Sequence, residues 1–157
     1  MKSVRINQSL NLVVLAHDAR GYYQAYLELK KNKEKVFVLS SPAFMCLAFS
    51  LELHLKLLLR LHEIKVRGHE ISKLVKALPK KDVEILSMSN HLYPMHQGEH
   101  FNTELFKLNR FFNRVRYYFE DLGTMTLDPW FSLGLIKAIQ ERIAAISPAL
   151  GYDLGLP

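Results

Sequence analysis

Apolar residues recur every three or four positions along most of the chain, a spacing that predicts helices. The first such segment, Ser9 to Lys31, carries its apolar residues at Leu12, Ala16, Ala19, Tyr23, Tyr26 and Leu27. The short apolar run at 36–39 has no second candidate strand to pair with. It is predicted to be a loop packed on the helices.

A second helix is predicted to begin at Ser41 and Pro42. The serine side chain can cap the first turn, and the missing N–H of proline costs no hydrogen bond at the first helical position. It is expected to end near Lys65. Two short helices follow, at about 71–78 and 81–88, and then a loop over 90–100 that contains proline and glycine without periodicity.

The most regular segment is a predicted helix over 102–122. Its apolar seam is formed by Leu105, Leu108, Phe112, Val115, Phe119 and Leu122. A last helix is expected from Pro129 to Pro148, followed by an irregular tail. Long helices joined by short connections indicate an all-α, antiparallel bundle of four to five helices, with Met1–Pro157 as a single domain.

Composition agrees with a folded domain, since 49% of the 157 residues are hydrophobic. A formal charge of +6, from 21 basic and 15 acidic residues, favours anionic partners such as RNA, DNA or acidic proteins. The densest basic run, at 30–35, is expected to be a solvated connector.

Several features predict a cytoplasmic protein. The lone Cys46 excludes an internal disulfide and favours a reducing compartment. The first residues lack the pattern of a secretory signal. The uncharged apolar run from Pro42 to Leu51 is about half of what a bilayer requires, so no membrane partner is expected.

A polar stripe on the 102–122 helix is the strongest candidate for function. Asn109, Asn113, Arg116 and Glu120 are spaced by four, three and four residues, so they share a face beside the apolar seam. Polar groups at the edge of a core require partners, which here can be a ligand or another subunit.

The opposite side of that helix carries Arg110, Arg114 and Tyr117, which suit a nucleic-acid backbone or form an ordinary solvated face. On the second helix, Glu52 and Lys56 are four residues apart and can pair. They form either a simple surface ion pair or part of a groove between helices in which Arg116 or Glu120 interacts with them.

Other chemistries find little support in the sequence. His91, His96, Glu99 and His100 cluster in the 90–100 loop, but their loose spacing does not favour a metal site. Phosphate-binding loops, dinucleotide fingerprints and common hydrolase motifs are absent from the sequence. No metal and no cofactor are therefore predicted.

Three motifs in order resemble the HEPN family: A-x-x-LE-x-x-LK over 48–56, Gly-His-Glu-Ile over 68–71, and RY-x-x-E over 116–120. The resemblance implies a helical bundle that forms a homodimer, with functional groups in a cleft between helices or subunits. It also implies a context of RNA cleavage, RNA or nucleotide binding, toxin–antitoxin systems or phage defence.

The ribonucleases of that family carry an arginine followed four to six residues later by a histidine, and this chain lacks the pair. The leading interpretation is therefore a domain that binds RNA, a nucleotide or a partner protein through the polar stripe. An active ribonuclease is the alternative, with Arg116, Glu120 and His69, or a histidine of the 90–100 loop, as candidate catalytic groups. A plain oligomerisation or adaptor module is the third.

Overall fold

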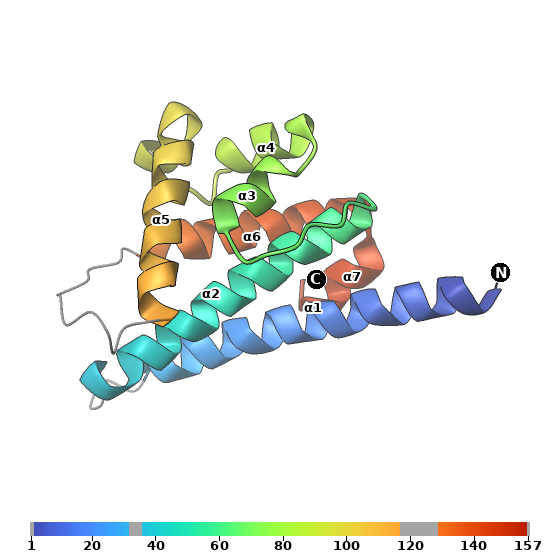
Figure 1. Cartoon of the computed structure of the whole chain (residues 1–157), viewed down its shortest axis with the longest axis horizontal. Coiled ribbons are helices and arrows are strands. Elements are labelled where there is room, and N and C mark those ends of the chain that lie inside the picture. Colours follow the sequence, from blue (N-terminus) through green and yellow to red (C-terminus); the bar gives the residue numbers. More distant parts are fainter. Residues whose placement is uncertain (1, 32–35, 117–128, 157) are drawn as a thin grey trace.

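A computed structural model describes residues 2–31, 36–116 and 129–156 (Figure 1). All regular structure in these ranges is helical, which confirms the predicted all-α class. The longer helices are α1 (Lys2–Lys31), α2 (Val36–Leu61), α5 (Phe101–Arg116) and α6 (Pro129–Ile146). Shorter ones are α3 (Ile71–Lys76), α4 (Lys80–Ser87) and α7 (Pro148–Asp153), with 3-10 turns at Pro94–His96 and Gly98–His100.

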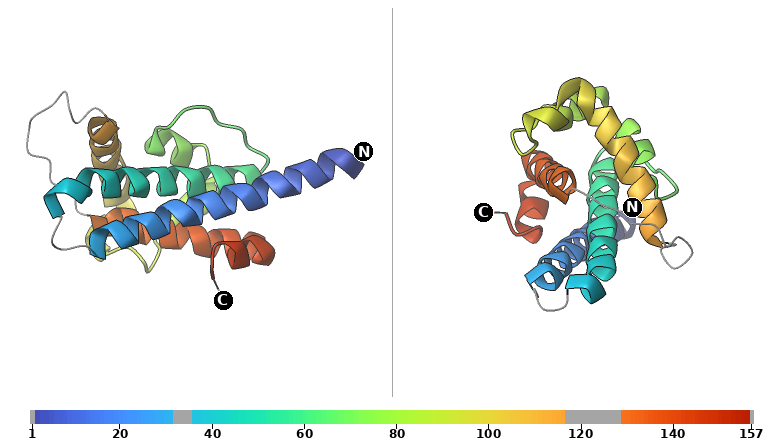
Figure 2. Two further views of the ribbon diagram at one scale, coloured as in Figure 1. Left: turned by 90° about the horizontal axis from the view of Figure 1, so that it is seen from below. Right: turned by 90° about the vertical axis from the view of Figure 1, so that its left-hand side faces the viewer.

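The helices α1 and α2 lie side by side and run in opposite directions (Figure 2). Small buried residues on α1, Ala16 and Ala19, allow the two backbones to approach closely. The hydroxyl of Ser50 on α2 donates a 2.9 Å hydrogen bond to the carbonyl oxygen of Ala19. This hairpin forms one side of the molecule.

The centre of the molecule is α2, which contacts α1, α3, α5 and α6. Leu57, Leu58 and Leu59 are consecutive and all buried, as expected for a helix covered on every side. Its segment Pro42–Leu61 is also long and apolar enough to cross a membrane, but 61% of the relevant window is buried inside the protein. A buried core helix can have the same length and composition, so the segment is weak evidence for a membrane.

The helix α6 packs lengthwise against α2, whereas α5 crosses these two helices at a steep angle (Figures 1 and 2). The apolar seam of α5 is buried at Leu105, Leu108, Phe112 and Val115, as predicted; its last two members lie outside the described residues. The arrangement is thus less regular than a simple antiparallel bundle.

The start of α2 differs from the prediction. Residues 36–39 belong to the helix rather than to a loop, and Pro42 lies inside it rather than at its start. A proline there removes one backbone donor, but the residues that follow it, Ala43, Leu47 and Ala48, are buried, and this packing favours the helix.

The predictions for two other helix ends were also wrong. The helix α2 ends at Leu61 rather than near Lys65, because Glu63 adopts a left-handed conformation with φ 59°. The tail is not irregular: Pro148 begins α7, and Gly151 packs on Ala144 so closely that a Cβ atom at Gly151 would lie 2.6 Å from the Ala144 Cβ. The first helix begins at Lys2, before the predicted Ser9.

Two buried polar clusters connect the helices. His54 donates from Nδ1 to the Ser50 carbonyl at 2.7 Å and accepts at Nε2 from the Gln140 amide at 3.0 Å, so it joins α2 to α6. Burial lowers the pKa of His54 to about 4. Asp82 of α4, also buried, pairs with Arg142 of α6 at 2.5 Å and with His62.

Candidate functional site

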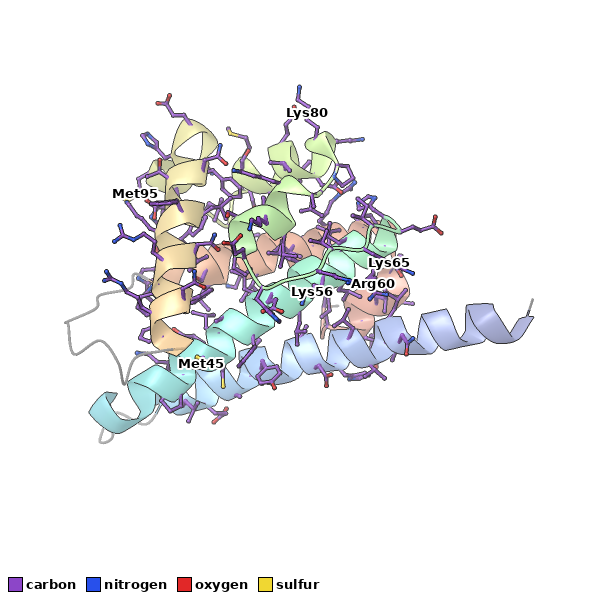
Figure 3. The ribbon with its side chains drawn as sticks, in the orientation of Figure 1. Met45, Lys56, Arg60, Lys65, Lys80 and Met95 are labelled. Carbon is purple, nitrogen blue, oxygen red and sulfur yellow. The ribbon has the colours of Figure 1, made fainter. Side chains whose placement is uncertain are left out.

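A three-residue polar cluster lies halfway along α2. The buried carboxylate of Glu52 accepts hydrogen bonds at Oε1 from Lys56 Nζ at 2.6 Å and from His69 Nδ1 at 2.7 Å. His69 reaches Glu52 because the segment 62–70, which follows α2, turns back along it (Figure 1). Figure 3 shows Lys56 and Arg60 on α2 near this returning segment.

The electrostatics of the cluster keep Glu52 charged. Burial by itself raises the pKa of the Glu52 carboxyl, but the hydrogen bonds and charges of Lys56 and His69 outweigh burial and hold the pKa below its usual value. A charged Glu52 accepts the Nδ1 proton of His69, which leaves the lone pair of a neutral His69 ring on Nε2. The side chain of His69 is 61% exposed, so this nitrogen sits on a ring that solvent reaches.

Asn109 connects α5 to the start of α3. Its amide nitrogen donates to the Ser72 hydroxyl at 2.6 Å, and its carbonyl oxygen accepts from the Ser72 backbone N–H at 3.3 Å. Ser72 lies three residues after His69, so this link and the Glu52 cluster belong to the same region between α2, α3 and α5.

Of the remaining members of the predicted polar stripe, only the side chain of Asn113 lies within the described residues. Asn113 is exposed. Arg116 ends α5, but its side chain, together with Tyr117 and Glu120, lies outside the described part of the chain. Their convergence on Glu52 and Lys56 remains a prediction.

The positive charge of the protein is concentrated around this region. Residues 52–76 and 101–116 hold ten of the 21 lysines and arginines but only four of the 15 acids, so the rest of the chain has 11 of each. These residues form the second half of α2, the returning segment, α3 and α5, which contact one another. We call them the basic face; Arg110 and Arg114 are exposed on it.

The histidines of the 90–100 loop separate from one another. His91 Nε2 pairs with Glu141 of α6 at 2.6 Å, whereas His96 is buried with its ring against Phe131. The side chains of Glu99 and His100 are largely exposed. Within the described ranges, no group of three or more histidine, cysteine or acidic side chains is placed to hold a metal ion.

Sequence reasoning found the Glu52–Lys56 pair and named His69, but it did not join them. Its expectation that Arg116 or Glu120 contacts Glu52 concerns side chains outside the described residues. It missed Ser72 entirely. The only sequence signal for His69 was the Gly-His-Glu-Ile motif. Its glycine indicates a turn after the helix, and a chain that reverses there brings the residues of the turn back alongside the helix. The thiol of Cys46 is partly buried, and this burial raises its pKa.

Comparison with models of known families, with curated proteins and with solved structures finds no match to this chain.

Proposed function

We propose that this chain is a HEPN-like domain that forms a homodimer and binds RNA through the basic face. The observation that carries the proposal is the location of the charge: the whole formal excess of +6 falls on elements that pack together. Such a concentration attracts the phosphates of a nucleic acid more strongly than the same charge spread over the surface. The resemblance of the three motifs supports the fold family and the setting of toxin–antitoxin systems or defence.

The polar groups of the candidate site add directional contacts to this charge. The ammonium of Lys56 has further N–H donors besides the one it gives to Glu52, and Asn109 supplies an amide next to the backbone of α3. Phosphate and sugar oxygens accept from such groups whatever the base sequence is. The proposal therefore expects RNA binding with low sequence preference and strong dependence on salt.

The test measures anisotropy of a labelled RNA over a series of salt concentrations. The double variant Arg67→Glu with Arg110→Glu changes the basic face, while Lys81→Glu with Lys137→Glu makes the same change in net charge at exposed positions elsewhere. The first variant should lose about tenfold or more in affinity and show a shallower salt slope, because each phosphate contact contributes about 0.7 to that slope for a single strand.

Two outcomes would overturn this proposal. Equal losses in both variants would mean that only net charge matters and that the basic face is not the site. No binding of any RNA at low salt would leave the adaptor interpretation in its place. Light scattering tests the dimer separately: a monomer at concentrations of about 100 μM would remove it.

A second candidate function, a ribonuclease, is favoured by one observation: a buried carboxylate orients an exposed imidazole at His69. In this reaction His69 Nε2 removes the proton of a 2′-hydroxyl as the 2′-oxygen attacks phosphorus. The 5′-oxygen leaves and takes a proton from water, which gives a 2′,3′-cyclic phosphate and a 5′-hydroxyl. In this candidate Arg116 stabilises the phosphate charge. His96, which the sequence also offered, is buried away from solvent.

Cleavage is tested with total RNA in EDTA and over a range of pH. His69→Gln should abolish the activity, whereas His100→Gln, at another exposed histidine, should leave it intact. Unchanged cleavage by a folded His69→Gln variant, or no cleavage by the parent protein, would exclude this candidate.

A further inference from the structure

Three large side chains form an exposed patch where the 90–100 loop meets the start of α6. Tyr93, Met95 and Trp130 are 52%, 70% and 56% exposed, and we call them the aromatic patch. The rings of Tyr93 and Trp130 lie 6.4 Å apart with an angle of 72° between their planes. The two exposed rings therefore meet edge to face at the surface.

Buried rings hold the aromatic patch in place. Tyr93 packs on His96 at 5.9 Å between ring centroids, and His96 packs on Phe131 at 5.6 Å. The amide of Gln97 donates to the carbonyl oxygens of Ser89 and Leu92, at 2.9 and 3.2 Å, and so fixes the loop that carries Tyr93. A surface that is already ordered loses little entropy when a ligand binds.

The aromatic patch lies near the start of α5, which belongs to the basic face. Phe101, the first residue of α5, packs its ring on Phe131, the neighbour of Trp130, with 5.7 Å between the ring centroids, and Figure 3 labels Met95 on the same side of the molecule as α5. The exposed residues of α5 include Lys107, Arg110 and Arg114, and Phe106, one turn before Arg110, is 62% exposed. Exposed rings next to a row of cations are the combination by which proteins hold single-stranded nucleic acids: bases stack and phosphates pair.

We propose that Tyr93 and Trp130 stack an unpaired base of single-stranded RNA whose phosphates lie along α5. This inference rests on the proposed RNA binding and names the form of RNA that the protein takes. A second copy of the chain fits this patch less well. A two-fold contact centred on the patch would bring two copies of α5 close together. Each copy carries four basic residues and one acid, so repulsion between like charges would oppose the contact.

The chain contains a single tryptophan, Trp130, so its intrinsic fluorescence reports directly on the aromatic patch. The experiment titrates the full chain with a single-stranded oligouridylate of about twelve nucleotides and with an RNA duplex of the same length. The single strand should quench the fluorescence on binding. The duplex should bind by its phosphates without comparable quenching.

Affinity is measured in parallel by anisotropy for Tyr93→Ala, Trp130→Ala and the control Tyr152→Ala, which removes an exposed ring on α7. Each of the first two should weaken single-strand binding by about five- to a hundredfold, and the control should not. Circular dichroism establishes that each variant is folded, and Tyr93→Ala keeps the fluorescent reporter.

The outcomes separate this inference from the proposed function. RNA binding that persists without quenching and is unchanged in Tyr93→Ala and Trp130→Ala would overturn the stacking site and leave the basic face standing. Loss of dimer in Trp130→Ala, with RNA affinity unchanged, would assign the patch to a second copy instead. No RNA binding at all would remove both proposals.

Discussion

The buried imidazole of His54 makes a specific prediction about acid stability. This side chain is completely enclosed, its polar partners Ser50 and Gln140 are neutral, and burial lowers its pKa from 6.5 to about 4. A group whose folded pKa is depressed binds a proton more readily in the unfolded chain. Its contribution is therefore complete above pH 6.5 and is lost as the pH falls from there to about 4.

The size of the effect follows from the shift. Between pH 7.5 and pH 5 the unfolded chain protonates His54 and the folded chain does not, which costs about 2 kcal/mol of the free energy of unfolding. The whole loss, reached near pH 4, is about 3 kcal/mol on the same basis. For a domain with a total stability of about 5–15 kcal/mol, this is a large fraction.

The assay compares urea unfolding at the two pH values for the parent protein, His54→Asn and a control, His100→Asn. His54→Asn lowers stability at neutral pH but should lose about 2 kcal/mol less than the parent on acidification, because asparagine does not titrate. His100, whose side chain is 61% exposed, should leave the parental pH dependence unchanged. If the parent and His54→Asn lost equal stability between the two pH values, the assignment of a neutral, enclosed His54 would be refuted.

Two further predictions concern the packing of α6. Asp82→Ala leaves the side chain of Arg142 without its buried partner and should lower the free energy of unfolding by about 3 kcal/mol in urea titrations; a loss below about 1 kcal/mol would contradict the ion pair. Gly134→Ala should destabilise by about 1–3 kcal/mol, because the new Cβ would lie 2.4 Å from the His91 carbonyl oxygen. Its control, Gly21→Ala on α1, meets nothing within 4 Å and should stabilise by about 0.5–1 kcal/mol; equal effects at both sites would refute the argument from contact.

The sequence predicted helices well where periodicity was strong. The seam of α5 and the buried face of α3 follow directly from apolar spacing, since Leu105, Leu108, Ile71 and Leu74 are all enclosed. It failed where a local signal competes with tertiary context. A serine and a proline predicted the start of a helix at Pro42, but the apolar residues before them continue the helix.

The candidate site shows the same division. The spacing of Glu52 and Lys56 on one helix face is local, and their predicted pairing is confirmed at 2.6 Å. The contact between His69 and Glu52 depends on the path of the segment 62–70, which turns at the left-handed Glu63 rather than at a glycine. Periodicity carries no information on such a reversal, so the distance between these two residues could not be predicted from the sequence.

The central position of α2 has a consequence for synthesis of the protein. When α2 leaves the ribosome, only α1 has been made to cover it, and α6, which lies along another side, is complete 85 residues after Leu61, at Ile146. At typical translation rates this interval lasts about 4–17 seconds. During that time a nascent leucine-rich helix is open to aggregation, so chaperones that bind apolar segments are expected to engage this chain before its synthesis is finished.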